Sequence, residues 1–229
     1  MSSILEIKKL RGGYVKGVDI LQGVDLAIEQ GEAVGIIGLN GCGKSTLGKA
    51  VMNMIPRREG TIAFNGEDIS SLPTHLISRK GISIMQQGGQ VFQTLSVWDN
   101  LRIAVGQDIE RKIDELKEII PLLSESKQQL QGRMADKLSG GQRHQLALAM
   151  ALATKPELLI LDEPSAGLSP KSVDQMYQML SDAKERYGLS ILLIEQNIAR
   201  AVEFCGRTLL ISRGYITDSL SNQFDNLIF

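Results

Sequence analysis

Short runs of apolar residues separated by turn signals organise most of this chain. Apolar and polar residues alternate around Leu5–Leu10 and again over residues 20–28, a period of two that is typical of strands. Continuous apolar runs at residues 33–39, 158–162 and 190–194 are typical of strands buried on both faces. This pattern predicts a β-rich start and a sheet whose central strands are covered on both sides.

Two short hairpins are indicated by paired strand signals around tight turns. Residues 61–64 end at Asn65-Gly66, a dipeptide that favours a two-residue turn. Residues 208–212 and 215–217 flank Arg213-Gly214 in the same manner.

Helical periodicity dominates residues 88–155. Residues 109–123 carry isoleucine and leucine at helical spacing, which predicts one amphipathic helix, and residues 142–154 are apolar enough for a buried helix. Another helix is expected from Ser45 to about residue 54. A fourth is expected to start at Ser169-Pro170, with serine as N-cap, and to end at Gly188. The fold class is therefore α/β, a mixed sheet with a mainly helical insertion at about residues 88–155.

Composition narrows the class of protein. The 229 residues include 25 Lys and Arg against 26 Asp and Glu, a net charge of −1 that gives no global field for attracting nucleic acid or anionic membrane. No apolar run approaches the ~18 residues that cross a bilayer, and the N-terminus lacks the apolar core of a signal peptide. Two cysteines do not make a disulfide framework in a chain of this length. We therefore expect a cytoplasmic protein.

A glycine-rich segment lies between the strand expected at residues 33–39 and the helix that follows. It fits the pattern G-x-x-x-x-G-K-[ST], in which backbone N–H groups and a helix N-terminus face phosphate oxygens. Lys44 is expected to reach the β- and γ-phosphates of a nucleotide, and the Ser45 hydroxyl to bind Mg²⁺. A chance glycine-rich turn is the alternative, which the strand–loop–helix context disfavours. The candidate nucleotide-binding residues here are Gly38, Asn40, Gly41, Cys42, Gly43, Lys44, Ser45 and Thr46.

Two acids end the strand expected at residues 158–162. Asp162 is expected to hold Mg²⁺, directly or through water, and Glu163 to polarise the attacking water. Apolar strands often end in acids, so this motif indicates a nucleotide site only in combination with the phosphate loop.

The sequence LSGGQ at residues 138–142 precedes the expected buried helix. Small residues at a helix start can receive an anion, although a plain glycine-rich cap has the same composition. The position of LSGGQ about twenty residues before the acidic strand, and downstream of a phosphate loop, is much more specific. From about Leu5 to Asp218, this arrangement resembles the ATP-binding subunits of ABC transporters.

The resemblance implies a P-loop NTPase of ABC type, with a RecA-like core, an N-terminal antiparallel β subdomain and a helical subdomain, in one domain over residues 1–229. It also implies that Tyr14 stacks on adenine, with an exposed hairpin tyrosine as the alternative. Gln87, after a strand near residues 81–85, would sense Mg²⁺. The segment from Gln87 to Asn100 would receive a transmembrane partner, and Trp98 within it has simple packing as its alternative role.

The resemblance further implies two ATP-binding subunits arranged head to tail. Each ATP would lie between the phosphate loop of one subunit and Ser139, Gly140, Gly141 and Gln142 of the other. Hydrolysis would open the pair and drive transport through two permease subunits. The chain is thus expected on the cytoplasmic face of the inner or plasma membrane, paired with itself or a sister ATPase, and without a nucleic-acid partner.

Two positions depart from the family pattern. Gln196 stands where a histidine usually contacts the γ-phosphate, and an amide donates a hydrogen bond but does not become cationic. Ser169 stands where aspartate is usual, and a helix N-cap can be its whole role. With the sequence EQN at residues 195–197, these departures are similar to the second ATPase of branched-chain amino acid importers and of related urea and amide importers. That subgroup often has glutamate at the position of Gln87.

The leading hypothesis is an ATP-hydrolysing importer subunit with Glu163 and Gln196 as its catalytic residues. Four alternatives stay open: an ABC exporter ATPase, an ABC ATPase acting on DNA or ribosomes, a kinase, and a non-hydrolysing binding module. The lack of heptads and the single phosphate loop disfavour an ATPase that acts on DNA or ribosomes. The LSGGQ sequence disfavours a kinase, and Glu163 disfavours a non-hydrolysing binding module. His144, just after LSGGQ, is expected on a helix surface, and Cys42 is expected to make the ATPase sensitive to thiol reagents.

Overall fold

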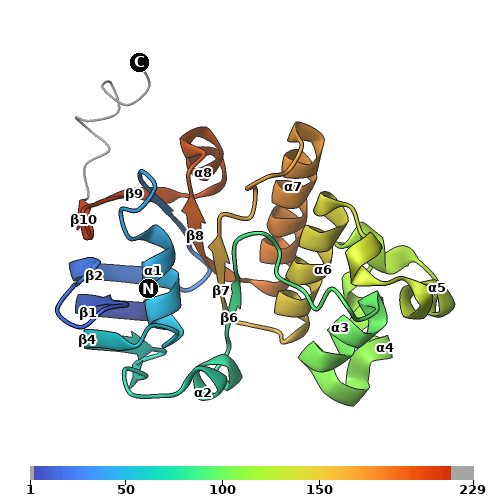
Figure 1. Cartoon of the computed structure of the whole chain (residues 1–229), viewed down its shortest axis with the longest axis horizontal. Helices are drawn as coiled ribbons and strands as arrows, with labels where there is room; N and C mark the ends of the chain where they lie inside the picture. Colours follow the sequence, from blue (N-terminus) through green and yellow to red (C-terminus); the bar gives the residue numbers. More distant parts are fainter. Residues whose placement is uncertain (1–2, 218–229) are drawn as a thin grey trace.

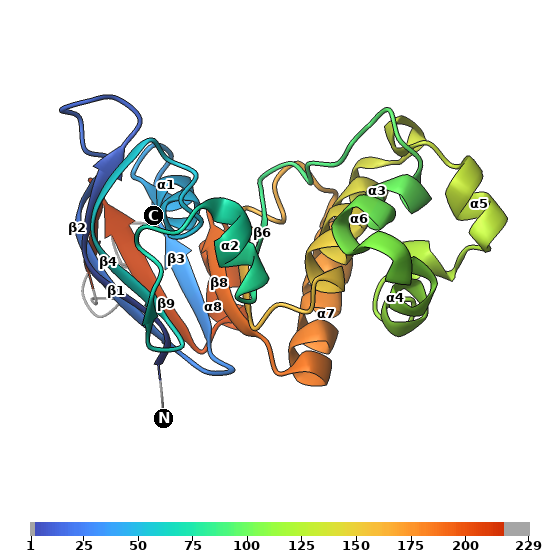
Figure 2. The same ribbon diagram turned by 90° about the horizontal axis from the view of Figure 1, so that it is seen from below.

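The computed structural model describes residues 3–217 of the chain. Figures 1 and 2 show an elongated molecule with two sheets at one end and a group of helices at the other. The outer limits of the expected domain, residues 1 and 229, and Asp218, where the family resemblance ends, lie outside the described residues.

An antiparallel sheet forms the outer layer, in the order β2-β1-β4-β5. Its strands are β1 (Ser3–Gly13), β2 (Leu21–Glu29), β4 (Arg57–Phe64) and β5 (Glu67–Asp68). Val24, Leu26 and Ile28 are buried while Asp25 between them is exposed, so the sheet covers the core with one face. The turn at Asn65-Gly66 has positive φ at both residues, 49° and 77°, as a two-residue hairpin turn requires. The expected N-terminal antiparallel subdomain is confirmed.

A second sheet runs through the middle of the core, in the order β10-β9-β3-β8-β7-β6. Its strands are β3 (Ala33–Ile37), β6 (Ile82–Met85), β7 (Leu158–Asp162), β8 (Ser190–Glu195), β9 (Arg207–Ser212) and β10 (Tyr215–Thr217). All neighbouring pairs are parallel except β10 and β9, which form the expected hairpin around Arg213-Gly214. The predicted mixed sheet is therefore confirmed.

Helix α1 (Lys44–Val51) lies between the two sheets (Figure 2). Leu47 and Val51 of α1 share a core with Leu158 and Ile160 of β7 and with the apolar face of the outer sheet. The alternate β7 side chains belong to the core on the opposite side, with α6 and α7. Burial on both faces explains why the central strands are apolar without interruption.

The remaining helices are α2 (Thr74–Arg79), α3 (Val97–Val105), α4 (Ile109–Leu116), α5 (Lys127–Gly132), α6 (Gly140–Ala153), α7 (Pro170–Tyr187) and α8 (Ile198–Phe204), with 3-10 turns η1 (Gly106–Asp108), η2 (Pro121–Ser124) and η3 (Ala135–Lys137). Of these helices, α2 contributes Ile77 to the core between the two sheets, whereas the others lie on the far side of the second sheet and extend beyond it (Figure 1). The predicted helical insertion at residues 88–155 thus contains α3 to α6. Within residues 3–217, no helix combines the length and apolar character needed to cross a membrane.

The single helix expected over residues 109–123 was wrong in length. Helix α4 ends at Leu116, and Pro121 begins the separate turn η2. Proline disfavours helical backbone at the residue before it, and Ile120 indeed has φ −108° and ψ 99°. By contrast, Ser169 caps α7 by accepting a hydrogen bond from the backbone N–H of Ser172, and Gly188 ends it with φ 63°, as predicted.

Candidate active site

The loop between β3 and α1 lines a cavity of about 350 Å³. Gly41 and Gly43 have φ of 77° and 111°, backbone conformations that glycine adopts without strain. Gly43 is the N-cap of α1 and provides no side-chain hydrogen bond to its first N–H groups. The positive end of the α1 dipole therefore lies at this cavity, where it favours an anion.

Lys44 adds a positive charge to the loop. Its side chain is 4% exposed, and its Nζ donates hydrogen bonds to the carbonyl oxygens of Gly38 at 2.8 Å and Leu39 at 3.1 Å. The same ammonium lies 3.8 Å from Oε1 of Glu163. The loop thus holds its lysine at the cavity that a phosphate chain would fill.

Ser45 and Asp162 bring a hydroxyl and a carboxylate together at the edge of the cavity. The Ser45 hydroxyl donates a hydrogen bond of 2.8 Å to Oδ1 of Asp162, joining α1 to the end of β7. Burial raises the pKa of Asp162 above its ordinary value, and the hydrogen bond from Ser45 opposes that rise. Hard oxygen atoms of this kind suit Mg²⁺, so the residues present fit the expected ion.

Glu163 is held between two amides. The Gln87 Nε2 donates to its Oε2 and the Gln196 Nε2 donates to its Oε1, each at 2.7 Å. Glu163 itself is 5% exposed and lies at the cavity with both glutamines. Because Gln87 uses its nitrogen in this bond, its amide oxygen is the atom that it can offer to a cation. Three loops from separate strands therefore converge on one carboxylate.

The other residues predicted from the phosphate loop fall into two groups. Asn40, Gly41, Gly43 and Thr46 line the cavity, whereas Gly38 and Cys42 belong to the loop without lining it. Tyr14 follows β1, is 45% exposed and does not line the cavity. Its adenine contact stays a prediction.

Ile20 lines the cavity and was missed by sequence reasoning. Its side chain would be 3.4 Å from a Cβ built on Gly43. The residue directly precedes β2, so the alternating pattern indicated a strand position rather than a site. Ile20 reaches the cavity only because the start of β2 packs against the phosphate loop.

The LSGGQ segment lies on the helical part, at the start of α6 (Figure 2). The Ser139 side chain accepts a hydrogen bond from the N–H of Gln142, and the Gln142 side chain accepts one from the N–H of Ser139. Gly140 and Gly141 form the first turn behind this cap. None of these four residues lines the phosphate-loop cavity of its own chain.

The segment from Gln87 to Asn100 connects β6 to α3. Asn100 is fully buried and organises the segment, because its Oδ1 accepts from the N–H of Phe92 and its Nδ2 donates to the carbonyl oxygens of Phe92 and Ser96. Trp98 is 7% exposed and packs in the helical core, with Lys127 Nζ 5.0 Å from its ring centre. Packing is thus the observed role of Trp98.

His144 corrects an expectation. It is 5% exposed rather than on the helix surface, because the loop at Gly89 packs against it. Its Nδ1 lies 2.9 Å from the carbonyl oxygen of Gly140, and within the described part of the chain its Nε2 has no partner. Burial lowers the pKa of His144 below its ordinary value.

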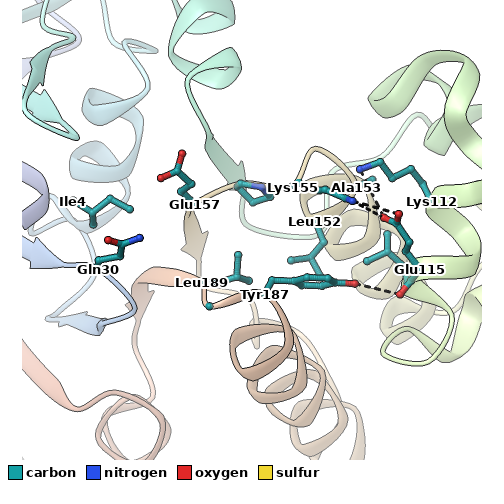
Figure 3. Close-up of a pocket in the computed structure, with 13 residues that line it drawn as sticks. Ile4, Gln30, Lys112, Glu115, Leu152, Ala153, Lys155, Glu157, Tyr187 and Leu189 are labelled. Carbon is teal, nitrogen blue, oxygen red and sulfur yellow. Dashed lines mark hydrogen bonds and ion pairs between the residues drawn. The ribbon is translucent and has the colours of Figure 1, made fainter.

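A second cavity, of about 270 Å³, is lined by α4, by the C-terminal ends of α6 and α7, and by Ile4 and Gln30 (Figure 3). There, Lys155 Nζ forms an ion pair of 3.1 Å with Oε2 of Glu115, and the Tyr187 hydroxyl donates to the Glu115 carbonyl oxygen at 3.2 Å. No residue predicted for nucleotide, metal or catalysis lines it. The phosphate-loop cavity is therefore the candidate active site.

The sequence matches the model of the protein family described as "ABC transporter" over residues 21–166. One relative is the lipopolysaccharide export system ATP-binding protein LptB of Escherichia coli K12, 34% identical over 93% of this chain and 88% of that protein. Another is the probable branched-chain amino acid transport ATP-binding protein LivF of Archaeoglobus fulgidus, 36% identical over 93% of this chain and 90% of that protein.

The fold agrees with solved structures. A nucleotide-free ATP-binding cassette from an ABC transporter superposes with a TM-score of 0.83 at 25% identity, over 94% of this chain and 90% of that one. The expected fold class is confirmed by this likeness and by the two sheets and helical region described above.

Proposed function

Because the chain belongs to the ABC transporter family of ATP-hydrolysing cassettes, we propose that it is the energy-coupling subunit of an importer, with Glu163 as general base. The observation that carries the base assignment is the two-sided clamp on the Glu163 carboxylate by Gln87 and Gln196 at the edge of the phosphate-loop cavity. A carboxylate held by both oxygens has a fixed orientation for taking a proton from water.

The other residues of the cavity have complementary tasks in this proposal. Lys44 and the α1 N-terminus would bind the phosphates, and Ser45, Asp162 and the Gln87 amide oxygen would hold Mg²⁺. When bound, Mg²⁺ would neutralise negative charge on the β- and γ-phosphates. Gln196 keeps the Glu163 carboxylate aimed at the water, and it stays an uncharged donor because an amide does not titrate.

We also propose that the active site is completed by a second subunit. Ser139 and Gly140 are exposed at the start of a fourteen-residue helix, where N–H groups and the helix dipole favour an anion. These residues lie outside the cavity of their own chain. A head-to-tail partner would bring a second LSGGQ segment onto the ATP held here.

Import of branched-chain amino acids or related polar solutes is the finer proposal. It is supported by the EQN sequence at residues 195–197 and by the likeness to LivF. The likeness to LptB is of the same order, and it favours export of a lipid substrate as the second candidate. The two differ in the direction and chemistry of transport, which the membrane subunits decide.

The docking of those membrane subunits is proposed for the segment from Gln87 to Asn100. Phe92 is 51% exposed there, and Met134, 38% exposed, lies nearby because Ser96 and Met134 pair as an isolated β-bridge. An exposed apolar surface on the segment that starts at Gln87, one of the two residues that clamp Glu163, suits a partner helix that senses the state of the site. Through such a partner the chain would be held at the cytoplasmic face of the membrane.

Glu163→Gln tests the base assignment. We expect ATP affinity to stay within about threefold while hydrolysis falls ~100-fold or more, because the amide cannot accept the proton. An ATP-bound dimer should then accumulate on size-exclusion chromatography. Glu157→Gln, at the other end of β7, is the matched control. Hydrolysis by Glu163→Gln at the wild-type rate would overturn the assignment.

Transport itself is tested in vesicles. The chain is co-expressed with candidate permease subunits, and ATP-driven uptake of labelled leucine or urea is measured. Uptake supports the importer, whereas release of a lipid from the membrane supports the exporter.

A further inference from the structure

A buried carboxylate at the end of β8 gathers hydrogen bonds from three elements. Glu195 is 2% exposed, although it directly precedes the exposed Gln196. Its Oε1 accepts from the Ser165 hydroxyl at 2.7 Å, the Ser165 N–H at 3.3 Å and the Tyr177 hydroxyl at 3.1 Å. Its Oε2 accepts from the N–H groups of Gln196 at 3.0 Å and Asn197 at 3.3 Å. In all five of these hydrogen bonds the Glu195 carboxylate is the acceptor, so both of its oxygens are held by donors.

These donors flank both members of the Glu163–Gln196 hydrogen bond. Ser165 lies two residues after Glu163, whose own φ of 50° is a left-handed conformation that is uncommon outside glycine. The backbone N–H of Gln196 binds Glu195, and the side-chain amide of the same residue donates to Glu163. One carboxylate is therefore bonded to the turn that presents the base and to the backbone that presents its orienting amide.

We propose that Glu195 is a positioning residue for ATP hydrolysis, which fixes the Glu163 turn and the Gln196 backbone in one mutual arrangement. The backbone bond from the Glu163 N–H to the Ile194 carbonyl oxygen, 2.8 Å, ties the same two segments once more. This inference rests on the proposed role of Glu163.

Tyr177 extends the arrangement to α7. Burial, with the nearby Glu195 charge second, raises the pKa of the Tyr177 hydroxyl, which therefore remains a donor. Its ring packs edge-on against Phe204 of α8, with ring centres 5.5 Å apart and planes at 62° (Figure 1 shows both helices). Asn197, the N-cap of α8, is itself bonded to Glu195. Two helices are thereby anchored to the same carboxylate.

Glu195→Gln is the sharpest test, because it preserves shape but places an NH₂ group against donors whichever way the amide turns. In the full-length protein, we expect kcat to fall at least tenfold while the KM for ATP changes less than threefold. Hydrogen exchange should quicken at residues 163–169 and 195–198 and stay unchanged in β1 and β4. An unchanged kcat, or a loss of kcat that follows a general loss of thermal stability, would overturn the proposal.

A double-mutant cycle tests whether Glu195 acts on kcat through Gln196 or independently of it. If Glu195 acts through Gln196, then adding Gln196→Ala to Glu195→Gln lowers kcat by less than twofold further. Independent, multiplicative losses would contradict the proposal.

Tyr177→Phe removes one donor without altering the Glu195 carboxylate. This variant tests the same proposal if Glu195→Gln does not fold. It should lower kcat about threefold or more. Tyr187→Phe on the same helix, whose hydroxyl binds the Glu115 carbonyl oxygen, should leave kcat unchanged. If Glu163→Gln abolishes hydrolysis while Glu195→Gln and Tyr177→Phe do not affect it, the positioning role alone fails. If Glu163→Gln retains hydrolysis, the base assignment fails first.

Discussion

The side-chain amide of Gln196 donates a 2.7 Å hydrogen bond to Oε1 of Glu163, linking the residue after β8 to the residue after β7. Gln87 holds the other carboxylate oxygen at the same distance. The clamp is uncharged on both sides, so it orients Glu163 without adding a group that titrates near neutral pH.

Gln196→Ala removes one side of this clamp. We expect kcat to fall about 10- to 100-fold with little change in KM for ATP, because the lost interaction orients the base rather than binding the phosphates. Steady-state ATPase assays measure both constants. Gln178→Ala, which removes an exposed amide on α7, is the control. A fall in ATP affinity without a fall in kcat would contradict this assignment.

Lys44→Ala should weaken ATP binding itself. The Nζ lies in the phosphate loop on the carbonyl oxygens of Gly38 and Leu39, and a hydrogen bond to a charged group contributes about 1.5–3 kcal/mol. The Kd for ATP, measured by calorimetry, should therefore rise about 10- to 100-fold. Lys8→Ala, an exposed lysine of β1, should leave Kd unchanged. An unaltered Kd in Lys44→Ala would contradict the predicted phosphate contact.

Gly38→Ala should lower stability and not only binding. A Cβ at this position would lie 2.4 Å from the Ile211 carbonyl oxygen, so β9 must shift to admit it. Such overpacking costs about 1–3 kcal/mol of unfolding free energy, which urea denaturation measures. At Gly206 a Cβ meets nothing within 4 Å, so Gly206→Ala is the control that should stay near wild type.

His144 predicts a pH dependence of stability. Its pKa in the folded protein lies below the ordinary value, so the unfolded chain binds more protons and stability falls as pH drops below about 6.5. Urea unfolding at pH 7.5 and 5.5 should show a smaller loss on acidification for His144→Gln than for wild type. His75→Gln, at an exposed histidine, should keep the wild-type dependence. Equal pH dependence in all three proteins would contradict the burial argument.

Thiol labelling should distinguish the two cysteines. Cys42 lies half-buried in the phosphate loop, whereas Cys205 is buried and its thiol pKa is raised to about 12 by burial and by the nearby Glu195 charge. Maleimide should therefore modify Cys42 first, and ATP should block it, as mass spectrometry of the labelled peptides would reveal. Cys42→Ser provides the control in which labelling is lost. Modification of Cys205 at the same rate would contradict the prediction.

The sequence by itself determined the elements that local chemistry decides. Apolar runs gave the central strands, Asn65-Gly66 gave a hairpin turn, and Ser169-Pro170 gave the start of α7. The phosphate loop was readable because glycine, lysine and serine at fixed spacing serve one task on adjacent residues. The length of α4 was misjudged because the apolar periodicity continues past Leu116, where the helix ends, into the separate turn that begins at Pro121.

Tertiary structure alone decided which distant residues meet. Glu163 lies 76 residues from Gln87 and 33 from Gln196, and neither spacing carries a signal in the sequence. The buried state of His144 and the entry of Ile20 into the cavity depend likewise on loops from elsewhere in the chain. The physical reason is that parallel strands deliver their carboxyl ends to one edge of the sheet. Side chains that follow separate strands therefore converge only after β6, β7 and β8 have paired.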